Sequence, residues 1–95
     1  MPEMLFDVRW PNGATQRCYS PSLVIRDHFL AGASYEIGDF LTRSRSALNE
    51  ASERVRLRYG MPCSRAIGQL AEIESRAGGF PAGATVTVLA FHDVD

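Results

Sequence analysis

The sequence predicts a single α+β domain in which three helices cover one face of a three-stranded antiparallel sheet. Apolar residues alternate in short stretches near both ends of the chain, and they recur every three to four residues through its middle. The predicted order is β-β-α-α-α-β, in one domain of residues 1–95. A hairpin alone is barely stable, so we expect the last strand to lie beside the first and antiparallel to it.

Two stretches have the alternation of half-buried strands. In residues 4–10 every second side chain is apolar, and Pro11-Asn12-Gly13 then favours a tight turn. Proline presets the first central position of such a turn, and glycine accepts the left-handed position. Residues 84–91 are rich in β-formers and alternate as well, with Val86, Val88 and Ala90 sharing one face.

Two registers are open to the hairpin. A three-residue loop pairs Phe6 with Cys18 and Asp7 with Arg17, whereas a two-residue Asn-Gly turn pairs Phe6 with Tyr19. We prefer the first register because it forms a cross-strand ion pair and turns Cys18 toward the core.

The middle of the chain predicts three helices. Ser20-Pro21 resembles an N-cap followed by proline at the first helical position, which predicts a short helix over residues 21–30. Its Leu23-Val24-Ile25 segment is also compatible with a strand, and residues 31–35 form a connection. Apolar three-four spacing predicts a long helix over residues 37–59, and a second amphipathic helix follows over residues 62–77.

The break between the two longer helices has clear signals. Gly60 ends the first helix, and Pro62 prevents its continuation. The first helix would measure about 35 Å at about 1.5 Å per residue, against a radius of gyration of about 12 Å for a compact chain of this size. It must bend, protrude or pack on another subunit. We therefore predict a homodimer that uses this helix or an open sheet edge.

Composition excludes several classes of protein. The net charge is −1, and all ten basic residues are arginine, which is unlike the strongly basic balance of a dedicated nucleic-acid binder. No segment approaches the roughly 20 apolar residues of a membrane span, and no secretory signal is visible. Two cysteines make no disulfide framework. We expect a soluble cytoplasmic protein with no nucleic-acid or membrane partner.

Candidate ligand groups gather where helices begin. Cys63, Ser64 and Arg65 open the second long helix, whose free amides favour a thiolate or an anion. Ser20 and Ser22 begin the short helix in the same way. These five residues are our candidate anion or metabolite site, and the simpler interpretation is a core cysteine with ordinary capping serines.

Other candidate chemistry is weaker. A nucleophile at Cys63 would need His28 or His92 as its base. The histidines and cysteines lack the close paired spacing of a zinc site, so we predict no metal and no cofactor.

Arginines on the long helix form a candidate interaction surface. Arg43, Arg54 and Arg58 fall near one helical face, while Glu50 and Glu53 interleave with them. Acid-first pairs at i,i+4 are expected between Asp39 and Arg43 and between Glu50 and Arg54. A solvated, ion-paired surface therefore explains this pattern better than a nucleic-acid site.

Several blocks of sequence carry a family resemblance. They are the opening Met-Pro-Glu-Met with Val8-Arg9-Trp10-Pro11-Asn12-Gly13, then Cys18-Tyr19-Ser20-Pro21-Ser22, Gly32-Ala33-Ser34-Tyr35, Arg43-Ser44-Arg45, Ala51-Ser52-Glu53-Arg54-Val55-Arg56, Arg58-Tyr59-Gly60, Cys63-Ser64-Arg65-Ala66 and Gly68-Gln69-Leu70-Ala71-Glu72-Ile73-Glu74. In these blocks, which span nearly the whole chain, it resembles a family of small bacterial nitrogen-starvation response proteins encoded in a conserved nitrilase gene cluster.

The resemblance implies a setting rather than a reaction. The neighbours in that cluster resemble a nitrilase, a radical-SAM protein, an acetyltransferase, an AIR-synthase-like protein and a flavoprotein, and the cluster is associated with nitrogen scavenging and cyanide assimilation. The small member has no assigned catalytic residues to carry over. The favoured hypothesis is a non-catalytic accessory protein that binds itself or other proteins of the cluster. The alternatives are a small-metabolite module or minor enzyme at Cys63-Ser64-Arg65, and nucleic-acid binding through the arginines.

Overall fold

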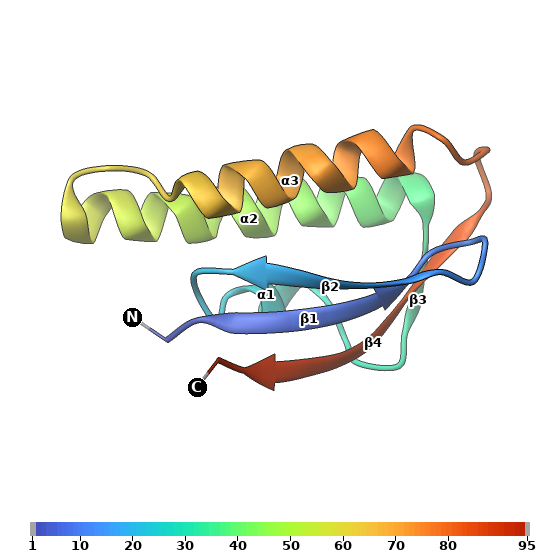
Figure 1. Ribbon diagram of the computed structural model, residues 1–95, viewed down its shortest axis with the longest axis horizontal. Helices are drawn as coiled ribbons and strands as arrows, with labels where there is room; N and C mark the ends of the chain where they lie inside the picture. The colour runs from blue at the N-terminus through green and yellow to red at the C-terminus, as the bar shows by residue number, and fades with distance from the viewer. Residues whose placement is uncertain (1, 95) are drawn as a thin grey trace.

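The two long helices form a layer of their own beside the strands (Figure 1). The structure, a computed structural model, describes residues 2–94. In chain order its elements are β1 (Met4–Arg9), β2 (Thr15–Ser20), α1 (Ile25–His28), β3 (Ser34–Glu36), α2 (Ile37–Tyr59), α3 (Ser64–Ala77) and β4 (Thr85–Asp93). The α+β class and the antiparallel sheet are therefore confirmed.

The N-terminal hairpin has the preferred register. Phe6 lies opposite Cys18 and Asp7 lies opposite Arg17. The turn is closed by the Trp10 N–H, which donates to the Ala14 carbonyl over 2.8 Å. The last strand, β4, pairs antiparallel with β1 as predicted.

The sheet has four strands, so the prediction of three was wrong. Its order is β2-β1-β4-β3, which puts β1 and β4 in the centre. The added strand β3 falls in the predicted connection and pairs only Ser34–Glu36 with Thr87, Val86 and Thr85. Three residues are too few for an alternating pattern to be visible in sequence. The strand exists because the chain runs back along β4 before it enters α2.

A β-bulge interrupts the alternation of β4. Val88 lies opposite Val8, but Ala90 lies opposite Asp7, which leaves Leu89 as an extra residue. One extra residue exchanges the two faces of the strand beyond it. Ala90 therefore shares the Asp7 face, and Phe91 packs against the core. The prediction that Ala90 shares a face with Val86 and Val88 was wrong for this reason.

Two predicted helix starts were also wrong. α1 is a single turn, Ile25–His28, rather than a helix over residues 21–30. The Ser20 hydroxyl donates to the Ser22 carbonyl over 2.8 Å, so it stabilises a turn instead of capping a helix. α3 begins at Ser64 rather than at residue 62.

The core lies between the sheet and the helices. Phe40 is fully buried, and its ring centroid is 5.5 Å from that of Trp10 and 5.4 Å from that of Phe29. Leu48 from α2 and Ile73 from α3 continue the same cluster. Both long helices thus contribute to the core on one face of the sheet.

The molecule is elongated, and the long helix α2 lies along its long axis. The principal extents are 38 × 23 × 18 Å, with a radius of gyration of 12.7 Å. Figure 1 shows α2 and α3 side by side along the long axis, with their joined ends projecting past the sheet. Of the three predicted outcomes the helix protrudes, so its length alone does not require a second subunit.

Candidate functional site

The projecting end of the α2–α3 pair exposes large apolar side chains. We call residues 57–67 the hairpin tip. Within it Leu57 is 72% exposed, Tyr59 63%, Met61 73% and Ile67 54%. Tyr59 continues the three-four apolar spacing of α2, but the sheet ends before it reaches this turn (Figure 1). Large apolar side chains that are exposed in this way can bind another molecule.

Gly60 shapes this tip. Its φ of 86° is left-handed, and its N–H donates to the Arg56 carbonyl over 2.7 Å. Only glycine adopts that conformation at little cost, so Gly60 both ends α2 and turns the chain back toward α3. The conformation of Gly60 therefore sets the direction in which the chain enters α3.

A cavity of about 260 Å³ lies between the hairpin tip and the near end of the sheet. Its walls are Glu3, Tyr19, Pro21, Val55, Tyr59 and Cys63. Of these only Cys63 was a predicted site residue. Glu3, Tyr19 and Tyr59 were missed because they come from three separate segments, and only tertiary packing brings them together.

Tyr19 organises one wall of this cavity. The guanidinium carbon of Arg65 lies 3.7 Å from the centroid of its ring. The Tyr19 hydroxyl donates to Glu3 Oε2, and Arg65 Nη1 is 3.7 Å from the same oxygen. Burial, reinforced by the hydrogen bond to the Glu3 carboxylate, raises the pKa of Tyr19 above its usual range. The hydroxyl is therefore a neutral donor at neutral pH.

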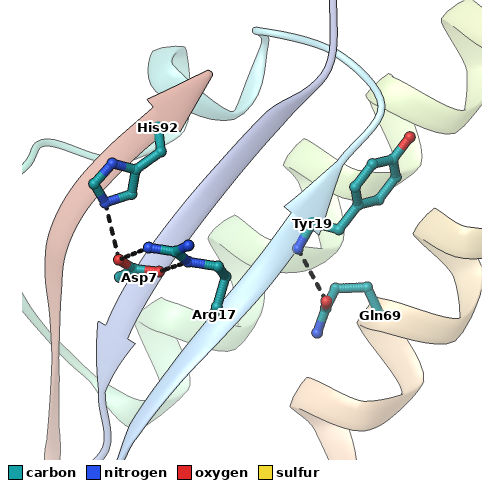
Figure 2. A network of polar contacts seen from close by, with 5 residues as sticks. All are labelled: Asp7, Arg17, Tyr19, Gln69 and His92. Atoms are coloured by element: carbon teal, nitrogen blue, oxygen red, sulfur yellow. Dashed lines mark hydrogen bonds and ion pairs between the residues drawn. The ribbon is translucent and has the colours of Figure 1, made fainter. Parts of the chain in front are cut away.

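The backbone of Tyr19 fastens the edge of the sheet to α3. Its N–H donates to Gln69 Oε1 over 2.9 Å (Figure 2). This contact satisfies an edge amide of β2 that no strand pairs. It also fixes the position of α3 relative to the cavity wall.

The structure separates the five candidate anion-site residues into two groups. Cys63 is half-buried and lines the cavity, while Ser64 and Arg65 beside it are exposed. Ser20 and Ser22 are buried, and their hydroxyl groups bond to neighbouring groups in the turn. Only the residues at the start of α3 thus remain open to a ligand.

Neither histidine reaches Cys63 or its cavity. His28 Nε2 is 3.0 Å from Glu50 Oε2, and His92 Nε2 is 3.0 Å from Asp7 Oδ2. The other thiol, Cys18, is 1% exposed, and burial raises its pKa to about 12. The structure thus brings together no thiol and histidine pair.

A second polar cluster lies on the outer face of the sheet, the face away from the helices. Figure 2 shows Asp7 on the central strand between Arg17 of β2 and His92 of β4. Arg17 donates to both carboxylate oxygens, over 2.9 and 3.1 Å. The hydrogen bond from Arg17 is the main reason that the pKa of Asp7 lies below its usual value. This cluster ties three strands together and was foreseen only in its Asp7–Arg17 pair.

The candidate arginine surface is mostly paired within α2. Arg43 Nε lies 3.0 Å from Asp39 Oδ2, and Arg54 Nη2 lies 3.6 Å from Glu50 Oε1. Both predicted i,i+4 pairs are therefore present. Arg58 lies over the ring of Tyr59, 5.7 Å from its centroid, at the hairpin tip. Neighbouring carboxylates and aromatic rings thus contact most of these arginine side chains.

Within residues 2–94, no group of three or more histidine, cysteine or acidic side chains is placed to hold a metal ion. No helix in the same range is long and apolar enough to cross a membrane.

The fold and the site define a small two-layer α+β protein whose distinguishing surface is an exposed helical tip over a small cavity. The chain belongs to the family of the nitrogen starvation-induced protein NitG, whose family model matches residues 5–91. The family expected from the sequence blocks is thereby confirmed. Searches of curated proteins and of solved structures found no match.

Proposed function

We propose that this chain is a non-catalytic accessory protein of the nitrogen-starvation response, and that it binds another protein of the nitrilase gene cluster through the hairpin tip. The observation that carries the proposal is the exposure of four large apolar side chains within residues 57–67. Along the rest of α2 the buried apolar side chains are those of Ile37, Phe40, Ala47, Leu48 and Ala51. Apolar and aromatic side chains of this size dominate the energy of protein interfaces.

The geometry of the tip supports a binding role. The tip is the end of two long helices that lie side by side (Figure 1). Arg45 Nη2 of α2 lies 3.0 Å from Glu74 Oε2 of α3, and this ion pair joins the two helices. A rigid helical end loses little conformational freedom when it binds, which favours affinity. Arg58 at the same end supplies a positive rim group.

A co-purification from nitrogen-starved cells tests this function. The tagged chain is compared with a tip variant, Leu57→Glu with Met61→Glu, and with a control, Ala82→Glu, which adds an acid in the exposed turn before β4. We expect the wild type and the control to recover a protein encoded in the nitrilase cluster, and the tip variant to lose it. Equal recovery with the tip variant, or recovery of no cluster protein at all, would reject the proposal.

The second candidate is a small-metabolite or anion site, and the cavity beside Cys63 favours it. The cation for such a site is Arg65. Its side chain is exposed, but it lies near the Glu3 carboxylate and over the Tyr19 ring. A Glu3→Gln substitution removes the competing carboxylate and frees the guanidinium for an added anion.

Titration of ¹⁵N-labelled protein with inorganic phosphate and with acetate tests the second candidate. Binding would shift the amide signals of residues 63–66, and the Glu3→Gln variant would bind more tightly than the wild type. Unchanged spectra of both proteins would exclude an anion at this place, whatever the outcome of the co-purification.

A further inference from the structure

The structure contains a sheet edge that its own chain leaves incomplete. The edge strand β3 pairs with Thr85, Val86 and Thr87 only, and the adjoining loop adds hydrogen bonds between Gly32, Ala33 and Val88. β4 continues to Asp93. On the side away from β1, residues 89–93 therefore have no strand beside them in the described chain.

The bulge decides which main-chain groups face this edge. Val88 directs its N–H and its carbonyl toward the edge, since both bond to the loop at residues 32–33. Edge-facing residues alternate along a strand. The extra residue at Leu89 shifts that alternation by one, so Phe91 and Asp93 present their N–H and C=O groups outward.

The opposite edge of the sheet is not available in this way. The Tyr19 N–H on β2 is already bonded to Gln69 of α3. Gln16 of the same strand donates from Nε2 to Glu72 Oε1 over 2.8 Å. Side chains of α3 therefore cover β2, whereas no side chain is bonded to the edge at residues 89–93 in the described chain.

A hollow of about 390 Å³ borders the open edge. Its lining includes Arg26, Ala31, Phe91 and Asp93. Leu30, which precedes Ala31, is 71% exposed, and Val94, which follows Asp93, is 40% exposed. An added strand would thus meet apolar surface as well as main-chain groups.

We propose that the open edge of β4 is a self-association site, at which residues 89–93 of two copies pair antiparallel about a two-fold axis near Phe91. In that arrangement Asp93 of each copy lies opposite Leu89 of the other, on the side where Arg26 lines the hollow. Among residues 2–94 neither Arg26 nor Asp93 forms an ion pair within its own chain. The edge thus carries its own complementary charges, which favours a second copy over an unrelated strand.

This dimer leaves the proposed partner-binding tip free. In Figure 1 β4 runs along the side of the molecule opposite to α3. Each dimer would present two hairpin tips, so a bivalent partner would gain from effective concentration. The self-association itself does not depend on the proposed partner.

Light scattering across a concentration series tests the edge. We expect the purified chain to approach twice its subunit mass of 10.5 kDa. Asp93→Arg alone, or Arg26→Asp alone, places like charges together and weakens the dimer at least about tenfold, and the double variant restores it. Arg9→Asp is the matched control, because Arg9 lies away from the edge and takes part in no ion pair among residues 2–94; it should leave the mass unchanged.

Hydrogen exchange supplies a second measurement. Pairing at the edge protects the Phe91 and Asp93 amides in the wild type and in the double variant, but exposes them in the single variants. A monomer at high concentration overturns the inference. So does a dimer that survives both single charge reversals, or one that is lost on Leu57→Glu, because that dimer would use the hairpin tip.

Discussion

One helix, α2, supplies both core and exposed apolar residues, and two substitutions distinguish them. Phe40 is fully buried between Trp10 and Phe29, whereas Leu57 on the same helix is 72% exposed. Truncating a buried phenylalanine loses transfer free energy and leaves a cavity, so Phe40→Ala should cost about 3–5 kcal/mol. Leu57→Ala removes a side chain that contacts mostly water and should change the stability by less than about 0.5 kcal/mol.

Urea unfolding measures both effects with one probe. Trp10 is the only tryptophan, it is 2% exposed, and its fluorescence reports the loss of its contact with Phe40. With a urea dependence of about 1.5 kcal/mol per molar, Phe40→Ala should lower the midpoint by about 2–3 M. Since a domain of this kind has only about 5–15 kcal/mol of stability, that variant approaches the limit of folding. Phe40→Leu is the milder variant if Phe40→Ala fails to fold.

The comparison can fail in two informative ways. If Phe40→Ala shifts the midpoint by less than about 0.5 M, the aromatic cluster is not the centre of the core that the structure shows. If Leu57→Ala costs as much as Phe40→Ala, the hairpin tip is already packed against something in the purified protein. The second result would contradict the view of the tip as a surface kept free for a partner.

Three further predictions concern single groups. The pKa of Asp7 is lowered in the folded state, mainly by Arg17. The contribution of Asp7 to stability is therefore full above the unfolded pKa of 3.8 and is lost as the pH falls through the lower folded pKa. Urea midpoints measured from pH 6 to pH 2 should fall less steeply in Asp7→Asn than in the wild type. A thiol reagent should modify Cys63 in the folded protein at once and Cys18 only in denaturant, because Cys18 is buried with a pKa of about 12; a Cys63→Ser variant that still reacts quickly would contradict this. Gly60→Ala forces a side chain to a φ of 86° and should cost about 1 kcal/mol, although a Cβ there meets no other atom within 4 Å; no change in the urea midpoint would show that the tip relaxes.

Local patterns predicted the elements whose cause is local. The hairpin register followed from the turn residues and from the Asp7–Arg17 pair, both of which lie within a short stretch. The bounds of α2, Ile37–Tyr59, followed from its apolar spacing and from Gly60. In each case the signal and the structure that it specifies involve the same residues.

The features that were missed depend on distant segments. β3 is a strand only because β4 lies beside it, and three residues carry no period of their own. The bulge at Leu89 depends on pairing with β1, since both faces of β4 carry residues that suit a strand. Tyr59 matches the core stripe of α2 in spacing, and only the end of the sheet leaves it exposed.

The candidate site was foreseen in part. The start of α3 was identified from its cysteine and arginine, and the structure places Cys63 on a cavity wall. The carboxylate that completes the surroundings comes from Glu3, just before β1, and the two tyrosines come from β2 and α2. No spacing rule connects residues so far apart in the chain, which is why the sequence singled out Cys63 but not the side chains that surround it.

The central pairing of β1 with β4 has a kinetic consequence. Met4 lies opposite Asp93, so this pair of strands closes a loop of almost the whole described chain, and such non-local pairing slows folding. We expect the β1–β2 hairpin and the α2–α3 pair to form early, and β4 to dock last between β1 and β3. Substitutions within β4 should then accelerate unfolding far more than they retard folding.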